Sequence, residues 1–382
     1  MSQIAPLVED IAPADFEAEL RGRADVVVLD TRDRASYAAW RVGGARHLRN
    51  TPEEELGTDA DVLLAGLPAH ARVRVICHAG IGSRRVAAAL MDRFAEVLSV
   101  SGGMIGWSRV LQASDVPVAA PFDVVQFRRE ARGCLSYLVV SGGEALVVDP
   151  APGVAPYLEE AEARGARITR VFDTHVHADH LSGARALASA AGAALHLSRA
   201  ALRRGLRYGD AIAPVADGDR LPLGDASVRV VALPGHTSDM TGLALGEAAL
   251  IGGDCLFTDS VARPDLEAGD AGADEAARQL FATLGERVAP MPDATLLLPC
   301  HYAGGRLPGP LTATLGEIRG RVPELVLERE AFVERVLSQL PPTPANHLRI
   351  IAVNLGEEMP ADDAARLEVG VNSCAARRDW VG

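Results

Sequence analysis

Four apolar, strand-like segments in the later part of the sequence each end in a histidine or an aspartate. They run into THVHADH at residues 174–180, PGH at 234–236, GGD at 252–254 and PCH at 299–301. Glycine before a ligand lets the backbone turn tightly, and imidazole and carboxylate bind zinc and iron alike. A single histidine is commonly a satisfied core residue, but four such strand ends together predict one metal pocket. Its seven predicted ligands are His175, His177, Asp179, His180, His236, Asp254 and His301.

The first part of the sequence is typical of a parallel α/β domain. Short apolar runs alternate with helical patterns, and these predicted elements span residues 26–30, 73–77, 83–94 and 97–100. Strands that alternate with helices indicate a parallel sheet with helices on both faces. In such sheets functional groups gather beyond the carboxyl ends of the strands. Asp30 and Cys77 both stand at such ends.

A domain boundary is predicted within residues 114–122, SDVPVAAPF, which carry two prolines and little periodicity. We therefore expect a first domain over residues 1–117 and a second over residues 118–382. The second should be a sheet-rich α/β domain with a helix near residues 154–164. Two of its strands, CLSYLVV and EALVVDP, are joined by a turn at SGG.

The end of the second domain is expected to carry a helical extension. Residues 311–340 read as mainly helical. Residues 348–356, LRIIAVNLG, are expected to form a final strand or a packed extended segment.

Composition and net charge argue against several classes of protein. The 382 residues are 48% apolar, which argues against a disordered chain, and the net charge of −13 opposes binding to nucleic acid or to anionic membranes. No apolar stretch of about 20 residues predicts a transmembrane helix. The five cysteines are odd in number and form no CxxC pair. Reduced thiols in a cytoplasmic protein are therefore expected.

The order HxHxDH, Gly-His, Gly-Asp and a late histidine resembles the metallo-β-lactamase superfamily over roughly residues 122–310. The resemblance implies an αββα sandwich with its metal site between the sheet edges, and it makes Asp149 an early structural aspartate. In a two-metal member of the superfamily, two sets of three ligands are bridged by Asp254. The sets are His175, His177 and His236, and Asp179, His180 and His301.

Residues 253–257, GDCLF, and 261–266, VARPDL, resemble the persulfide dioxygenases within that superfamily. In that family one ferrous iron is held by two histidines and one aspartate, which carry over to His175, His236 and Asp254. Such a set leaves positions open for oxygen and substrate. The remaining four predicted ligands then become hydrogen-bonding groups that orient it: His177, Asp179, His180 and His301.

The resemblance also implies candidate catalytic residues around the metal. Asp179 and His180 belong to this group. Arg263 is implied to bind the carboxylate of a thiol carrier such as glutathione, and the alternative is a structural arginine. Cys255 and Cys300 flank two ligands, but side chains alternate along strands, so both are expected to point away from the metal.

Residues 77–84, CHAGIGSR, resemble the CxxGxxS loop of rhodanese domains, and the resemblance extends over about residues 8–112. Such a loop runs from a strand into a helix, where amide N–H groups and the helix N-terminus stabilise a thiolate or persulfide anion. The resemblance implies transfer of sulfane sulfur, with Cys77 carrying the sulfur as a persulfide. The alternative is an inactive rhodanese module used for packing or regulation.

Both resemblances concern sulfur, so the leading hypothesis is an iron-dependent sulfur dioxygenase fused to a sulfurtransferase. Its substrates would be a low-molecular-weight thiol persulfide and molecular oxygen, and its product sulfite. The main rival is a two-zinc hydrolase, such as a thioesterase resembling glyoxalase II. A third hypothesis is a non-catalytic sulfur carrier or sensor. Dimers are common in the superfamily, so a homodimer is expected by analogy alone.

Overall fold

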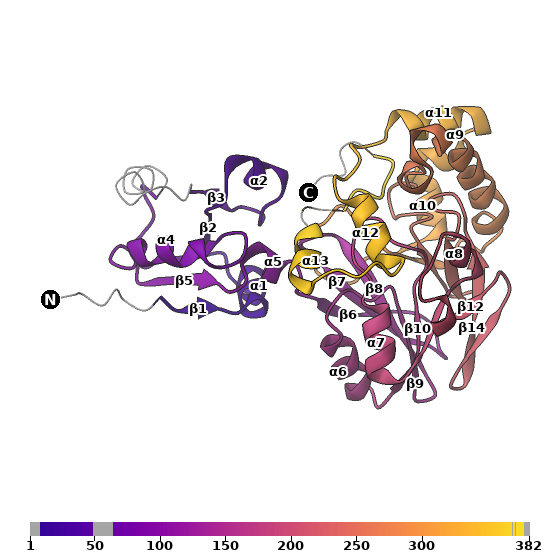
Figure 1. The fold of residues 1–382 in the computed structure, drawn as a ribbon, viewed down its shortest axis with the longest axis horizontal. Helices are drawn as coiled ribbons and strands as arrows, with labels where there is room; N and C mark the ends of the chain where they lie inside the picture. Colours follow the sequence, from indigo (N-terminus) through magenta and orange to yellow (C-terminus); the bar gives the residue numbers. More distant parts are fainter. Residues whose placement is uncertain (1–7, 49–63, 369, 371, 378–382) are drawn as a thin grey trace. The chain divides into compact units, whose positions relative to one another are not determined.

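The structure is a computed structural model that describes residues 8–48, 64–368, 370 and 372–377. The chain divides into two compact units, whose elements are labelled in Figure 1. The first comprises residues 1–110 with 130–132, and the second comprises residues 111–129 with 133–382.

The boundary between the compact units lies after Val110, seven residues before the expected domain boundary at residue 117. Residues Gln112–Val116 form strand β6, which pairs antiparallel with β7 (Asp123–Arg129) of the second unit. The prolines that suggested a linker, Pro117 and Pro121, lie in the connection between these two strands. Proline is common in such connections because it has no N–H to offer a strand ladder.

The first unit is built on a parallel sheet with strand order β1-β5-β4-β2-β3. Its strands are β1 (Asp10–Ile11), β2 (Val26–Asp30), β3 (Arg46–His47), β4 (Arg72–Ile76) and β5 (Glu96–Val100). Its described helices are α1 (Pro13–Gly22), α2 (Arg34–Ala39), α4 (Gly82–Leu90) and α5 (Gly103–Trp107). The predicted strands and the helix after Cys77 are confirmed, although α4 ends at Leu90.

The second unit contains two sheets, of seven and six strands. The first has the order β12-β11-β10-β9-β8-β7-β6, and its further strands are β8 (Cys134–Ser141), β9 (Glu144–Val148), β10 (Arg167–Phe172), β11 (Ala194–Ser198) and β12 (Ala213–Val215). The second has the order β13-β14-β15-β16-β17-β18. Its strands are β13 (Arg220–Leu223), β14 (Ala226–Ala232), β15 (Thr241–Leu245), β16 (Ala249–Gly253), β17 (Leu296–Pro299) and β18 (Ala313–Thr314).

Helices cover the outer faces of both sheets (Figure 1). The described helices of the second unit are α6 (Ala155–Ala163), α7 (Ala184–Ala191), α8 (Arg199–Arg203), η1 (Gly209–Ala211), α9 (Asp265–Thr283), the π-helical η2 (Leu284–Val288), α10 (Leu315–Arg321), η3 (Pro323–Val326), α11 (Arg329–Ser338), α12 (His347–Asn354) and α13 (Ala361–Leu367). The predicted helix near residues 154–164 and the helical extension over residues 311–340 are confirmed. In the described part of the chain, no helix is long and apolar enough to cross a bilayer.

The alternation of side chains along β8 explains the layers of the second unit. Tyr137 and Val139 pack between the two sheets, whereas Leu138 and Val140 pack on the other face with the cluster that contains α6 and α7. Successive strand residues point to opposite faces, so both faces of β8 are buried, as its uninterrupted apolar run requires. With α9, α10 and α11 packed on the second sheet, the predicted αββα sandwich is confirmed.

The segment predicted as a final strand is instead helix α12, so that prediction is wrong. Its β-branched run, with Ile350, Ile351 and Val353, suggested a strand. The structure buries Ile350 and Asn354, which stand four residues apart and therefore on one helical face. Tertiary packing of this face outweighs the local strand preference.

Candidate metal centre and thiol site

All seven predicted metal ligands come together in the second unit, and each is at most 4% exposed. The loop after β10 carries the motif that begins at His175, and the loop after β14 carries His236. Strands β16 and β17 are parallel neighbours, so their carboxyl ends meet at one edge of the sheet. Asp254 and His301 follow these ends and lie 2.6 Å apart, from Oδ1 to Nδ1.

Three of these residues form a set that is open to a metal. His175 Nε2 and His236 Nε2 lie 3.8 and 3.5 Å from Asp254 Oδ2. All three atoms are buried, and none has a hydrogen-bond partner among the described residues. Buried polar atoms are nearly always satisfied, so three unpartnered ligand atoms that converge fit a bound cation. Two histidines and one carboxylate are the ligand set that non-haem ferrous iron uses.

Hydrogen bonds orient the two histidine rings toward this point. His236 Nδ1 lies 2.7 Å from the carbonyl oxygen of Arg263, to which only an N–H can donate. Thr174 Oγ1 gives its proton to Asp149 Oδ2 and therefore accepts from His175 Nδ1. Each neutral ring therefore carries its proton on Nδ1 and a lone pair on Nε2. This is the tautomer that binds a metal through Nε2. Burial, followed by the nearby His177 and His236, holds the pKa of His175 well below its usual value, which favours the neutral ring.

Asp149 organises the start of the metal-binding loop, in agreement with its predicted structural role. It follows β9 with a φ of 50°, and its Oδ1 accepts from the backbone N–H of Thr174 and lies 3.1 Å from His177 Nε2. Cys300 Sγ lies 2.6 Å from Asp149 Oδ2. Neither Cys300 nor Cys255 belongs to any group of potential ligands found among the described residues.

The second set of ligands is linked internally. Asp179 Oδ1 lies 3.0 Å from His180 Nδ1, and Asp179 Oδ2 lies 2.9 Å from His301 Nε2. Two further cysteines lie beside this set. Cys134 groups with all three residues, and Cys374 groups with Asp179, Asp254 and His301. Neither is near a ligand in the sequence, so no local signal marks them.

Residues of the C-terminal segment also hold the metal-binding loop. Asn354 Nδ2 donates to the carbonyl oxygens of His177 and His180, and its Oδ1 accepts from the N–H of Ser182. Glu368 accepts from the N–H of Leu181. These contacts span more than 170 residues of sequence, so spacing within a motif does not reveal them.

Arg263, which the resemblance implied to bind a substrate carboxylate, is engaged with protein groups in this structure. The side chain is fully buried, and its Nε and Nη2 donate to the two carboxylate oxygens of Asp265. The remaining N–H groups donate to backbone carbonyls of the C-terminal segment, at Pro341, Pro342 and Ser373. A guanidinium has five N–H groups, and these five bonds use all of them. This arrangement fits the alternative interpretation, a structural arginine.

The thiol of Cys77 occupies the predicted loop of the first unit, between β4 and α4. Its Sγ accepts from the N–H of Gly80 at 3.2 Å and lies 3.3 Å from Ser83 Oγ. Ser99 Oγ donates to Ser83 Oγ, which leaves the Ser83 proton for the sulfur. Gly80 has a φ of 82°, and a Cβ there would lie 2.6 Å from the N of Gly102. The loop thus needs glycine at this position and can support a sulfur anion.

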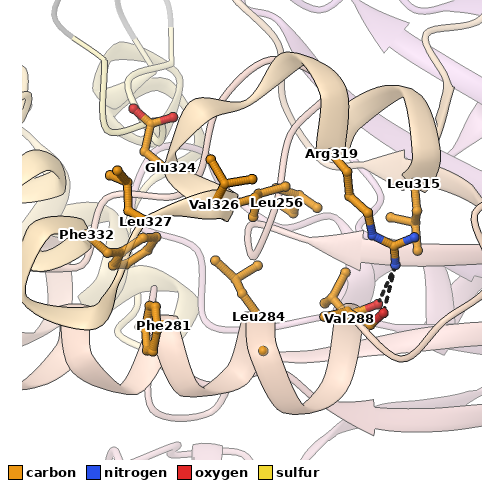
Figure 2. A pocket seen from close by; sticks show the side chains of 13 residues that line it. Leu256, Phe281, Leu284, Val288, Leu315, Arg319, Glu324, Val326, Leu327 and Phe332 are labelled. Carbon is orange, nitrogen blue, oxygen red and sulfur yellow. Dashed lines mark hydrogen bonds between the residues drawn. The ribbon is translucent and has the colours of Figure 1, made fainter.

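An apolar cavity of about 280 Å³ lies elsewhere in the second unit, between helices α9, α10 and α11 (Figure 2). Leu284 and Val288 of the π-helical turn line it together with Phe332, and Arg319 closes one end. Arg319 donates to the carbonyl oxygens of Val288, Ala289 and Met291. None of the predicted metal ligands lines this cavity, so it is separate from the metal centre.

Two family models match the chain. The model described as metallo-beta-lactamase superfamily matches residues 129–301, and the model described as rhodanese-like domain matches residues 12–110. Among solved structures, a metallo-beta-lactamase from Staphylococcus aureus is 26% identical with a TM-score of 0.57, covering 62% of this chain and 73% of that one. ETHE1 from Myxococcus xanthus is 25% identical with a TM-score of 0.51, covering 60% of this chain and 97% of that one.

Curated relatives include enzymes of two kinds. A hydroxyacylglutathione hydrolase of Acidiphilium cryptum is 40% identical over 32% of this chain, which spans about half, 49%, of that relative. One from Methylococcus capsulatus is 35% identical over 52% of this chain and 75% of its own length. Human mitochondrial persulfide dioxygenase ETHE1 is 28% identical over 62% of this chain and 84% of its own length. The chain therefore belongs to the metallo-beta-lactamase superfamily and also carries a rhodanese-like domain.

Proposed function

We propose that the protein is an iron-dependent persulfide dioxygenase coupled to a rhodanese sulfurtransferase. The observation that carries the proposal is the convergence of three buried, unpartnered atoms: His175 Nε2, His236 Nε2 and Asp254 Oδ2. These residues would hold one ferrous ion. When bound, such an ion supplies open positions at which oxygen and a persulfide sulfur meet.

The proposed reaction is RSSH + O2 + H2O → RSH + SO3²⁻ + 2H⁺. The S–S bond breaks, the inner sulfur leaves as the thiol, and the outer sulfur becomes sulfite. Four electrons pass from the persulfide to oxygen, so no further reductant is needed. The chain supplies a site in which His175, His236 and Asp254 are at most 1% exposed, and their orientation is set before any ligand binds.

The first unit would exchange sulfur with the same pool of persulfides. The thiolate of Cys77 attacks the outer sulfur of RSSH, the S–S bond of the donor breaks, and RSH leaves. Cys77 then carries the sulfur as a persulfide, and the reverse reaction returns it to a thiol. The Gly80 N–H and the Ser83 hydroxyl are placed to stabilise the sulfur anion.

The likeness to persulfide dioxygenases supports this proposal. The chain spans 84% of the human enzyme and 97% of the Myxococcus xanthus ETHE1 structure. A rhodanese-like domain in the same chain adds a second unit suited to persulfide chemistry.

A two-zinc hydrolase acting on a glutathione thioester is the second candidate. Two observations favour it: hydroxyacylglutathione hydrolases are 40% and 35% identical to parts of this chain, and all seven ligands of a two-metal site are present. His177 Nδ1 is also buried without a partner among the described residues, so it is available as a further ligand to the first metal. Two zinc ions would then activate a water molecule for hydrolysis.

Oxygen consumption and sulfite formation with glutathione persulfide test the proposal. The variants to compare are Asp254→Asn and the control Asp259→Asn, whose carboxylate pairs with Arg377 outside the ligand sets. An amide at position 254 can still accept from His301 Nδ1, so packing is kept while the metal-binding carboxylate is lost. We expect about one iron per chain in the wild type, and oxygen consumption that falls to background in Asp254→Asn alone.

The same preparations are given a hydroxyacylglutathione, and their metal content is measured. Two zinc ions per chain, with thioester hydrolysis that depends on Asp254 and no oxygen uptake, would replace the dioxygenase by the hydrolase. Oxygen uptake that persists in Asp254→Asn would refute the assignment of the reacting metal to this set.

A further inference from the structure

We propose that the apolar cavity between α9, α10 and α11 (Figure 2) is a binding site for a small, uncharged, apolar molecule. Neither Cys77 nor any predicted metal ligand lines it, so the site is independent of the proposed function. Protein interiors hold few voids larger than a water molecule, whereas this cavity has a volume of about 280 Å³. An apolar cavity of about 150 Å³, engineered into another protein, stays free of water and binds benzene. The space is therefore large enough for a ligand.

The wall of the cavity consists mainly of hydrocarbon side chains that face one another. Phe281, Leu284 and Val288 project from α9 and η2, and Val326 and Leu327 lie across the cavity from them (Figure 2). Three further apolar residues line it: Leu256, Leu315 and Phe332. An ordered buried water needs about two to four polar partners, and such a wall offers few. An apolar molecule is therefore the occupant that the wall favours.

Two charged side chains stand in the wall, Arg319 and Glu324, and both are already paired. Arg319 Nη1 forms an ion pair with the carboxylate of Asp293. Glu324 Oε1 accepts a hydrogen bond from Arg335 Nε at 3.2 Å. A charged ligand would have to disrupt these pairs and also give up its own hydration, and burying a charge without a partner is costly. The site therefore selects for an uncharged ligand.

The π-helical turn η2 keeps the space open. Ala289 N donates to Leu284 O, five residues earlier, at 2.8 Å, and single π-turns of this kind are frequent at functional sites. Arg319 holds the end of the turn through the carbonyl oxygens of Val288 and Ala289. Gly285, in the same turn, also lines the cavity, and a Cβ there would have open space around it. The backbone is thus fixed by hydrogen bonds in a form that leaves the cavity unfilled.

The cavity extends from the surface into the core of the second unit. Val326, at the end of η3, is 77% exposed, whereas Leu256 and Phe332 are at most 1% exposed. Because all three line the same cavity, apolar surface continues from the solvent to the buried end. A ligand can therefore enter beside η3 and bury its surface among the side chains of α9 and α11.

A matched pair of fluorescent dyes tests the proposal on the full chain. N-phenyl-1-naphthylamine is uncharged, and its sulfonated derivative carries the same rings with one negative charge. We expect the uncharged dye to bind with increased fluorescence at one site per chain, and the sulfonate to bind there at least about tenfold more weakly. Equal or tighter binding of the sulfonate at this site would overturn the assigned class of ligand.

A variant that fills the cavity locates the dye. Val288→Phe places a ring in the space that the ligand would occupy, and it should weaken binding of the uncharged dye by at least about tenfold. Leu348→Phe is the control, because it adds a ring at an apolar residue that is 67% exposed and does not line the cavity. It should leave the affinity unchanged. An unchanged affinity in Val288→Phe would overturn the proposal.

Xenon binding to crystals of the wild type gives a readout that does not depend on how a variant folds. Apolar cavities that are free of water bind xenon, so we expect a xenon atom among Leu256, Leu284 and Phe332. Ordered water or protein atoms in the same space, with no xenon, would overturn the proposal.

Discussion

Asn354 offers a direct test of how the C-terminal segment supports the metal centre. It stands at the end of α12 and makes three hydrogen bonds to the metal-binding loop. Its amide N–H groups donate to His177 O at 2.9 Å and to His180 O at 2.8 Å, and its oxygen accepts from Ser182 N at 3.0 Å. Asn354→Ala removes all three bonds and leaves two carbonyls and one N–H without their partner.

The structure sets the size of the expected effect. Each hydrogen bond contributes about 0.5–1.5 kcal/mol net, so three contribute about 1.5–4.5 kcal/mol. Residues that orient metal ligands typically change metal affinity by about 10–100-fold, or about 1.4–2.8 kcal/mol. We therefore expect Asn354→Ala to bind metal about 10–100-fold more weakly, with the remaining loss appearing in the stability of the apoprotein.

Competition with a chelator measures the affinity, and urea denaturation of the apoprotein measures the stability. Asn346→Ala is the control, because Asn346 precedes the same helix and its side chain donates to Leu367 O rather than directly to the metal-binding loop. An unchanged chelator midpoint in Asn354→Ala would show that Asn354 does not position the ligands.

Three further outcomes are expected. Cys77→Ser should abolish sulfur transfer from a persulfide to an acceptor thiol but retain oxygen consumption with preformed glutathione persulfide, and loss of both would show that the sites act in series. Arg263→Lys should lower the melting temperature and leave KM for the persulfide unchanged, because the guanidinium bonds Asp265 and backbone carbonyls; a raised KM without destabilisation would restore the substrate-binding role. Phe332→Ala should cost about 3–5 kcal/mol in urea denaturation, since this buried ring packs on Phe281, and an effect below about 1 kcal/mol would contradict that packing.

The parts of the site that sequence could predict share one physical basis. Asp254 and His301 end neighbouring parallel strands, and parallel strands bring their carboxyl ends to one edge. Short continuous apolar runs indicated these strands, so the position of the ligands followed from the fold. Cys77 was predictable for the same reason, as it follows β4 and precedes α4.

The parts that sequence missed depend on contacts between distant segments. Cys134 reaches the site through an antiparallel bridge to His301, and nothing in its own neighbourhood indicates that pairing. Arg263 matched a substrate-binding pattern, but its donors meet carbonyls 78 to 110 residues later in the chain. Asn354 lies in a segment whose β-branched residues suggested a strand. Each error therefore arises from the path of the C-terminal segment or from pairing between sheets.

The identity of the seven ligands does not distinguish a dioxygenase from a hydrolase, because both kinds of relative share the superfamily. The arrangement of their atoms is more informative. In the first set, His175, His236 and Asp254 present unpartnered atoms to one point, and three ligands leave room for reactants.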